Sequence, residues 1–165
     1  ELDRARMAAS AGAVGVVTEV GPVIEALART LEKLYGDRPI ELGTDVQAGI
    51  VFRGERQDLE EVVGNLLDNA CKWAVHKVAL TAAAEPASGD GRRWWQLSIE
   101  DDGPGLSEET REEVLRRGRR LDETKPGSGL GLSIVADLVG AYGGTLRLSR
   151  ALLGGLRVDV RLPAI

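Results

Sequence analysis

Hydrophobic residues recur at helical spacing in one long stretch near the middle of the chain. Between residues 60 and 74, apolar side chains are three or four positions apart, so they gather on one side of an α-helix. A polar stripe borders this face at i, i+4, i+7 and i+11: Asn65, Asn69, Lys72 and His76. At about 100° per residue, these four positions fall within about 60° of one another. The pattern predicts an amphipathic helix that directs two amides and an ammonium group toward one place.

Apolar spacing predicts other helices on either side of this stretch. Residues 22–35 form one, which ends at Gly36-Asp37, and residues 132–142 form another, which ends at Gly143-Gly144. Ser107 is suited to cap a short helix that runs through Leu115.

Alternating or β-branched residues predict the strands. The segments are 14–20, 40–42, 50–52, 78–82, 95–99, 146–148 and 156–162. We expect segments 40–42 and 50–52 to pair as a hairpin, and likewise 78–82 with 95–99 and 146–148 with 156–162. The inventory predicts an α/β (α+β) fold, a two-layer α/β sandwich whose mixed, mostly antiparallel sheet carries about three helices on one face.

Composition narrows the possible functions. A chain of 165 residues is enough for one domain, and it has no apolar run long enough to span a membrane. Its single cysteine, Cys71, excludes an internal disulfide and a cysteine-based metal site, so any metal should have oxygen ligands. The net charge of −5 gives no reason to expect a nucleic acid partner.

Two glycine clusters are candidate ligand loops. Gly103 and Gly105 follow an acidic pair, and residues 127–131 contain three alternating glycines at the start of a predicted helix. Free N–H groups at a helix start favour anions, which makes residues 127–133 a candidate phosphate cradle. The spacing matches neither a P-loop nor a dinucleotide-binding fingerprint. Either cluster alone is also explained by a tight turn.

The three motifs together are far more specific than any one of them. In chain order they are Asn65-Leu-Leu-Asp-Asn69-Ala-Cys-Lys-Trp, Asp101-Asp-Gly-Pro-Gly105 and Gly127-Ser-Gly-Leu-Gly-Leu-Ser133. This combination resembles the N, G1 and G2 boxes of the Bergerat-fold ATPases, which include sensor histidine kinases, Hsp90, type II topoisomerase ATPase domains and MutL. The motif sequences are most similar to those of sensor histidine kinases, and the resemblance covers roughly residues 40–163.

Residues just before and at the start of the third motif indicate which subgroup of sensor kinases the chain resembles. Arg120, the Lys125-Pro126-Gly127 sequence and the lack of a Phe-rich F box are similar to the magnesium-responsive subgroup of sensor kinases. The resemblance implies that residues 1–14 are the end of an upstream helical hairpin and its linker, and that residues 15–165 are a catalytic ATP-binding domain.

The resemblance also implies a role for each matching residue. Asp101 would accept a hydrogen bond from the adenine amine, because an ionised carboxylate is only an acceptor. Asn69, with help from Asn65, would ligate Mg²⁺ through an amide oxygen. The residues expected to act on the phosphates in catalysis are Asn65, Lys72, Arg120 and Lys125. The other residues expected to contact ATP are Trp73, Gly103, Gly105, Leu106, Gly127, Ser128, Gly129, Leu130, Gly131 and Leu132.

Simpler interpretations remain open for several of these residues. An aspartate before a glycine can cap a turn, a role for which Asp102 is better suited than Asp101. Lys72 can equally face solvent, Trp73 can equally belong to the core, and the asparagines can be solvated. His76, at the end of the helix, is more simply a surface residue than a ligand or base.

In the family, bound ATP gives its γ-phosphoryl group to a histidine on a separate phosphoacceptor domain, which then passes it to a response regulator. This chain has no histidine in such a context, so we expect the isolated catalytic part of a kinase. The intact protein is then expected to be a homodimer in the inner (plasma) membrane with this domain in the cytoplasm. Two alternatives stay open: a stand-alone serine kinase of the anti-sigma-factor type, and a nucleotide-binding interaction module.

Overall fold

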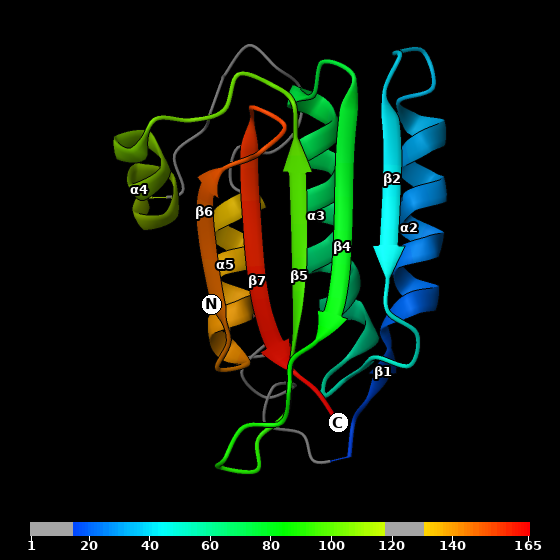
Figure 1. Cartoon of the computed structure of the whole chain (residues 1–165), viewed down its shortest axis with the longest axis vertical. Coiled ribbons are helices and arrows are strands. Elements are labelled where there is room, and N and C mark those ends of the chain that lie inside the picture. Colours follow the sequence, from blue (N-terminus) through cyan, green and yellow to red (C-terminus); the bar gives the residue numbers. More distant parts are fainter. Residues whose placement is uncertain (1–14, 118–130) are drawn as a thin grey trace.

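A computed structural model of the chain describes residues 15–117 and 131–165 (Figure 1). The helices in these ranges are α2 (Val20–Leu34), α3 (Arg56–Trp73), α4 (Glu108–Arg117) and α5 (Gly131–Ala141). The strands are β1 (Thr18–Glu19), β2 (Glu41–Val46), β3 (Val51–Phe52), β4 (Lys77–Ala84), β5 (Trp94–Asp101), β6 (Thr145–Arg150) and β7 (Leu156–Pro163).

Five of the strands form the main sheet, in the order β2-β4-β5-β7-β6. The β2–β4 pair is parallel, and the other three neighbouring pairs are antiparallel. Strands β1 and β3 form a separate two-stranded antiparallel sheet. The predicted mixed, mostly antiparallel sheet is confirmed, as are the β4–β5 and β6–β7 hairpins.

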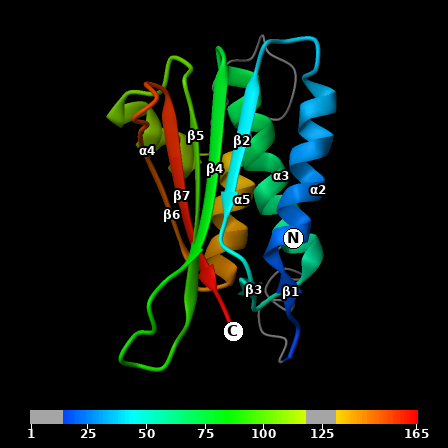
Figure 2. The same ribbon diagram turned by 45° about the vertical axis from the view of Figure 1, so that its right-hand side comes forward.

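Helices α2, α3 and α5 cover one face of the sheet, and Figure 2 shows the two layers from the side. The described helix α4 lies beside the β6 edge, where it contacts α5 and β6. The predicted two-layer sandwich with about three helices on one face is therefore confirmed, with α4 at its edge.

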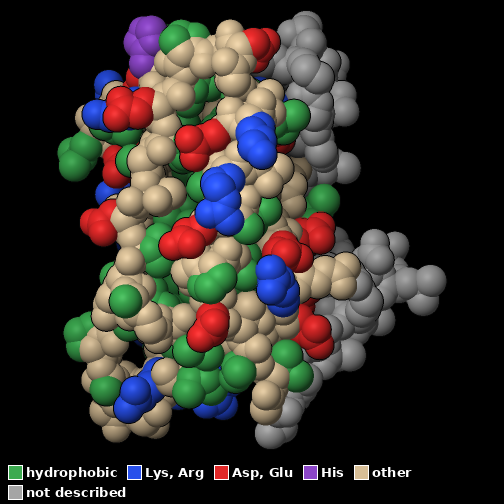
Figure 3. Space-filling view, turned by 90° about the vertical axis from the view of Figure 1, so that its right-hand side faces the viewer, with side chains coloured by type: hydrophobic (Ala, Val, Ile, Leu, Met, Phe, Trp, Pro, Cys, Tyr) green, Lys and Arg blue, Asp and Glu red, His purple; other side chains and the backbone are tan. Residues whose placement is uncertain are grey.

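Alternation along β5 shows why the layers pack in this way. Trp95, Leu97 and Ile99 are buried against the helices, whereas Gln96 is exposed on the open face of the sheet. Helix α3 contributes buried Leu66 and other apolar residues at helical spacing to the same core. On the side of the molecule that carries α2 and β2, acidic and basic side chains are intermingled (Figure 3). Among the described helices, none is both long and apolar enough to cross a membrane.

The hairpin expected from segments 40–42 and 50–52 is wrong. Strand β2 instead runs parallel to β4, with Glu41 opposite Lys77, whereas β3 leaves the main sheet to pair with β1. Phe52 of β3 is buried, with its ring 5.0 Å from the Tyr142 ring and 6.3 Å from the Trp95 ring. The core therefore draws β3 away from its neighbour in the sequence, because burying this ring requires a position over α5 and β5.

Two predicted boundaries also need correction. Helix α3 begins at Arg56, four residues before the predicted start, and it ends at Trp73. His76 therefore lies beyond the helix and is not part of the polar stripe. In the described part of the strand predicted for residues 14–20, only β1 is extended in a sheet, because Val20 already begins α2.

Candidate functional site

A small cavity of about 180 Å³ lies where the C-terminal ends of α3 and β5 meet. Its lining consists of Trp73, Asp101, Pro104, Gly105, Leu106 and Leu156. One carboxylate is thus set among mostly apolar walls. The cavity combines Trp73, at the end of the first motif, with Asp101, Pro104 and Gly105 of the second.

Asp101 is the charged group of this cavity, and only 3% of it is exposed. Its Oδ1 atom accepts hydrogen bonds from the N–H groups of Gly103 at 2.8 Å and Leu156 at 3.4 Å. Burial raises the pKa of the carboxyl group, and these two hydrogen bonds only partly oppose that rise. Burial of a carboxylate is costly unless a ligand or a charge compensates it, which is typical of a functional site.

Two glycines allow the backbone to approach this carboxylate closely. A Cβ atom on Gly103 would lie 2.3 Å from the Trp73 carbonyl oxygen, and one on Gly155 would lie 2.1 Å from Asp101 Oδ1. Any larger residue would therefore push the loop or the neighbouring turn away. The glycines keep α3, the β5 end and the β6–β7 turn in contact around one point.

The end of α3 is held by two side chains from other elements. Asp102 accepts hydrogen bonds from the N–H groups of Val75 at 2.8 Å and His76 at 3.0 Å. Arg38 donates to the carbonyl oxygens of Cys71 at 2.8 Å and Ala74 at 2.5 Å. A guanidinium group at a helix C-terminus satisfies free carbonyls and complements the helix dipole. Asp102 and Arg38 thus hold the C-terminal end of α3, where Trp73 lines the cavity.

The polar stripe of α3 continues away from the cavity. Asn65, Asn69 and Lys72 are half-buried there, and the Asn65 amide donates to the Glu61 carbonyl at 2.7 Å. A Cβ atom on Gly131 would lie 3.4 Å from the Asn65 side-chain oxygen, so the start of α5 lies against the stripe. The structure therefore brings the first motif together with the end of the third.

The remaining predicted contacts divide into three groups. Trp73, Gly105 and Leu106 line the cavity, so Trp73 is not simply a core residue. Leu132 is buried in the core, which leaves its backbone N–H in the first turn of α5 as the group that can meet a ligand. The other predicted contacts lie outside the described residues: Arg120, Lys125, Gly127, Ser128, Gly129 and Leu130.

Sequence reasoning did not find Pro104, Gly155 and Leu156 as parts of the site. Pro104 lies inside the second motif, so its position in the loop was the available signal. Leu156 belongs to a regular alternating strand, and nothing in that pattern distinguishes a residue that faces a cavity from one that faces the core. His76 is exposed and contributes its backbone, through the bond to Asp102.

Comparison with known proteins agrees with this geometry. Residues 54–165 match the family described as histidine kinase-, DNA gyrase B-, and HSP90-like ATPases. The chain belongs to this family. It is 41% identical over 99% of its length to the sensor protein kinase CarS of Pseudomonas aeruginosa, and 36% identical over 86% of its length to the virulence sensor histidine kinase PhoQ of Salmonella typhimurium. The aligned part is 35% of CarS and 28% of PhoQ, so the chain spans about a third of these relatives.

Solved structures of this ATPase family extend the comparison to the fold. The mycobacterial sensor histidine kinase MprB superposes with a TM-score of 0.76 at 29% identity, covering 92% of this chain and 98% of that one. The ATP binding domain of PrrB from Mycobacterium tuberculosis gives a TM-score of 0.71 at 25% identity, covering 91% and 97%. The resemblance to sensor histidine kinases, and the fold that it implied, are confirmed.

Proposed function

We propose that this chain is the catalytic, ATP-binding domain of a two-component sensor histidine kinase. The observation that carries the proposal is Asp101, a buried carboxylate with a raised pKa in a small cavity with mostly apolar walls. Such a group is costly to the fold and is explained by a ligand that donates a hydrogen bond to it. Membership of the ATPase family supports ATP as that ligand.

Adenine fits the chemistry of this cavity. The Asp101 carboxylate can accept a hydrogen bond from the exocyclic amine of adenine. Guanine would instead present a carbonyl oxygen to the same carboxylate and leave both groups unpaired. Trp73 and Leu156 supply the apolar surfaces that a planar base needs. A volume of about 180 Å³ is below that of a pocket for a whole drug-sized ligand, so the ribose and phosphates lie outside it, toward the polar stripe.

The polar stripe of α3 supplies what the phosphate end needs. Asn65 and Asn69 provide amide oxygens, and Lys72 provides a positive charge. No cluster of three or more His, Cys, Asp or Glu residues that could form a cation site occurs within residues 15–117 and 131–165. Mg²⁺ is commonly held by one or two protein oxygens together with phosphate oxygens and water, so the amide oxygens of the two asparagines are enough for it. When bound, Mg²⁺ would neutralise phosphate charge.

Transfer of the phosphoryl group requires a partner. In the proposed reaction the bond from the γ-phosphorus to the bridging oxygen of ADP breaks, and a bond to an imidazole nitrogen of an acceptor histidine forms. Lys72 would neutralise charge on the phosphates, and we extend the same role to Arg120 and Lys125. His76 lies beyond the end of α3 and not on a helix, so it does not match the helical setting of the family's acceptor histidine.

The chain's relatives suggest the wider setting. We infer a phosphoacceptor domain in the same protein, a response regulator that receives the phosphoryl group, and a membrane-bound homodimeric parent with this domain in the cytoplasm. The names of CarS and PhoQ as sensor kinases support this reading.

The experiment is a phosphorylation assay with radiolabelled ATP on the protein extended upstream to the length of its relatives. We expect label that is lost in acid and retained in base, as for phosphohistidine. Acid-stable label would favour a serine kinase, and absence of any label together with retained ATP binding would favour a nucleotide-binding interaction module.

A further inference from the structure

The turn between β6 and β7, residues 151–155, forms one side of the carboxylate's surroundings. Gly155 donates its N–H to the Asp101 carbonyl oxygen at 3.1 Å, and Leu156 donates its N–H to Asp101 Oδ1 at 3.4 Å. A Cβ atom on Gly105 would lie 3.3 Å from the Gly155 carbonyl group, so the loop after β5 also packs on this turn. The position of the carboxylate therefore depends on where the turn is held.

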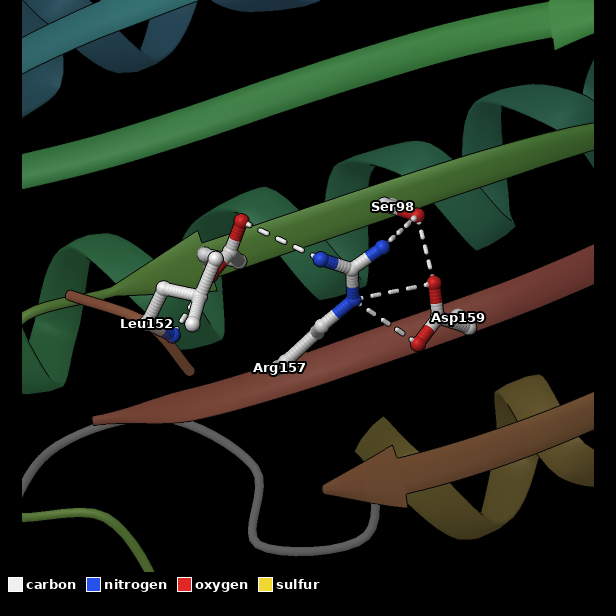
Figure 4. A network of polar contacts seen from close by, with 5 residues as sticks. Ser98, Leu152, Arg157 and Asp159 are labelled. Carbon is white, nitrogen blue, oxygen red and sulfur yellow. Dashed lines mark hydrogen bonds and ion pairs between the residues drawn. The ribbon is translucent and has the colours of Figure 1, made fainter. Parts of the chain in front are cut away.

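The Glu100 side chain joins this turn to Arg157 of β7, and Figure 4 shows Leu152 of the turn together with Arg157, Ser98 and Asp159. One carboxylate oxygen accepts a hydrogen bond from the Leu152 N–H at 3.0 Å, and the other lies 3.5 Å from Arg157 Nη1. The Leu152 side chain is 94% exposed, so it gives the turn no apolar anchor. Ala151 next to it is buried, and the hydrogen bond from the Leu152 N–H to Glu100 is the side-chain contact that ties this end of the turn to β5.

Arg157 in turn fixes the orientation of the Glu100 carboxylate. Its Nε atom lies 3.0 Å from Asp159 Oδ2, and its Nη2 atom donates to the Ser98 hydroxyl at 3.3 Å. Glu100 and Arg157 are direct cross-strand neighbours on β5 and β7. A guanidinium group held by both Asp159 and Ser98 offers its Nη1 group in one direction, so it restricts the rotamers of Glu100.

We propose that Glu100 is a positioning residue for adenine recognition. Successive residues of a strand point to opposite faces, so Glu100 lies on the open face and Asp101 in the cavity. By fixing the turn at Leu152, Glu100 fixes Gly155 and Leu156, and these set the Asp101 carboxylate. The inference rests on the proposed function, in which Asp101 accepts the hydrogen bond from adenine.

The same sheet face offers a matched control. Glu85, just after β4, is hydrogen-bonded to Arg161 of β7 at 2.9 and 3.0 Å. The side chains of Glu85 and Glu100 are both 18% exposed, so their burial is equal. Glu85 lies at the other end of β5, because its N–H bonds to the Trp94 carbonyl oxygen, whereas Asp101 is the last residue of that strand. Removal of Glu85 therefore breaks an ion pair with an arginine of β7, as removal of Glu100 does, but leaves the turn untouched.

The experiment compares Glu100→Ala, Glu100→Gln, Glu85→Ala and Asp101→Asn. Each variant is titrated with Mg-ADP and with Mg-GDP, its thermal unfolding is recorded, and amide hydrogen exchange is followed at residues 152–156. We expect Glu100→Ala to weaken ADP binding about tenfold, to lower the ADP-to-GDP affinity ratio and to speed exchange in the turn. Glu100→Gln keeps an acceptor for the Leu152 N–H and should lose less. Glu85→Ala should retain the affinity ratio of the unmodified chain even where its unfolding temperature falls.

The outcomes separate the two proposals. If Asp101→Asn weakens ADP binding while Glu100→Ala behaves like Glu85→Ala, the positioning role is refuted and the adenine site stands. If Asp101→Asn also leaves ADP affinity unchanged, the proposed function itself fails. Should Glu100→Ala not fold, Glu100→Val takes its place, because valine is favoured in strands and offers no acceptor for the Leu152 N–H: unchanged exchange at residues 152–156 and an unchanged affinity ratio would overturn the inference.

Discussion

Replacement of Gly103 by alanine should displace the loop that follows β5. The new Cβ atom would lie 2.3 Å from the Trp73 carbonyl oxygen, far inside normal contact distance, and 3.0 Å from Asp101 Oδ1, which is a tight contact. The backbone of Gly103 is not among those with positive φ, so the penalty is steric rather than conformational. Overpacking of this kind costs about 1–3 kcal/mol. A displaced loop also lengthens the 2.8 Å hydrogen bond from the Gly103 N–H to Asp101.

This free-energy cost can appear as a loss of folding stability or as a loss of nucleotide affinity, and two assays measure the two losses separately. Urea unfolding gives the loss of unfolding free energy. Titration with Mg-ADP gives the loss of affinity, roughly 5- to 150-fold if the loop takes the whole strain. Gly89→Ala is the control, because its Cβ atom would have nothing within 4 Å and its φ is not positive. If Gly103→Ala matched Gly89→Ala in both assays, the close contact between α3 and this loop would be wrong.

Three further predictions concern the helix and its attachment. Gly64→Ala adds a methyl group in the middle of α3, 3.8 Å from Leu27 Cδ2, and should raise the free energy of unfolding in urea by about 0.5–1 kcal/mol; a decrease would contradict the packing of α2 on α3. Burial raises the pKa of the Cys71 thiol to about 11, so the stability gained by burying the neutral thiol is complete below about pH 9 and is lost as the pH rises toward 11. Alkylation of Cys71 at pH 8 should therefore be far slower in the native protein than in urea. Equal alkylation rates would refute the burial of Cys71. Burial opposes ionisation of Asp102, but the N–H groups that bond to it outweigh burial and lower its pKa. Asp102→Ala should therefore lower the free energy of unfolding by about 1 kcal/mol at pH 7 and by progressively less as the pH falls below about 4. A difference in unfolding free energy that stays constant across that range would contradict the hydrogen bonds.

The local elements could be predicted from the sequence because their patterns are local. The apolar spacing of α3 and the alternation of Trp95, Leu97 and Ile99 each determine one element and its buried face. The position of β3 could not be predicted, because it depends on a long-range choice. The Phe52 ring packs against Tyr142, 90 positions further along the chain, and adjacency in the sequence gives no information about that contact.

The candidate site divides in the same way. Asp101, Asn65 and Asn69 could be proposed because motif spacing and the polar stripe of a helix are visible in the sequence. Leu156 and Glu100 could not, since their roles arise where β5 meets the β6–β7 turn. The sequence therefore indicates the groups that meet a ligand, whereas the groups that hold them in place emerge from the packing.

The most direct test of the central claim, that Asp101 receives the adenine of ATP, is a titration with Mg-ADP of the unmodified chain and of Asp101→Asn, each paired with urea unfolding at pH 7. The substitution keeps the shape of the side chain and removes a buried charge whose pKa is raised, so the free energy of unfolding should be equal or higher. Affinity for ADP should nevertheless fall at least tenfold, because the amide can turn a donor toward the donor on adenine. An unchanged affinity in a folded Asp101→Asn variant would contradict the account.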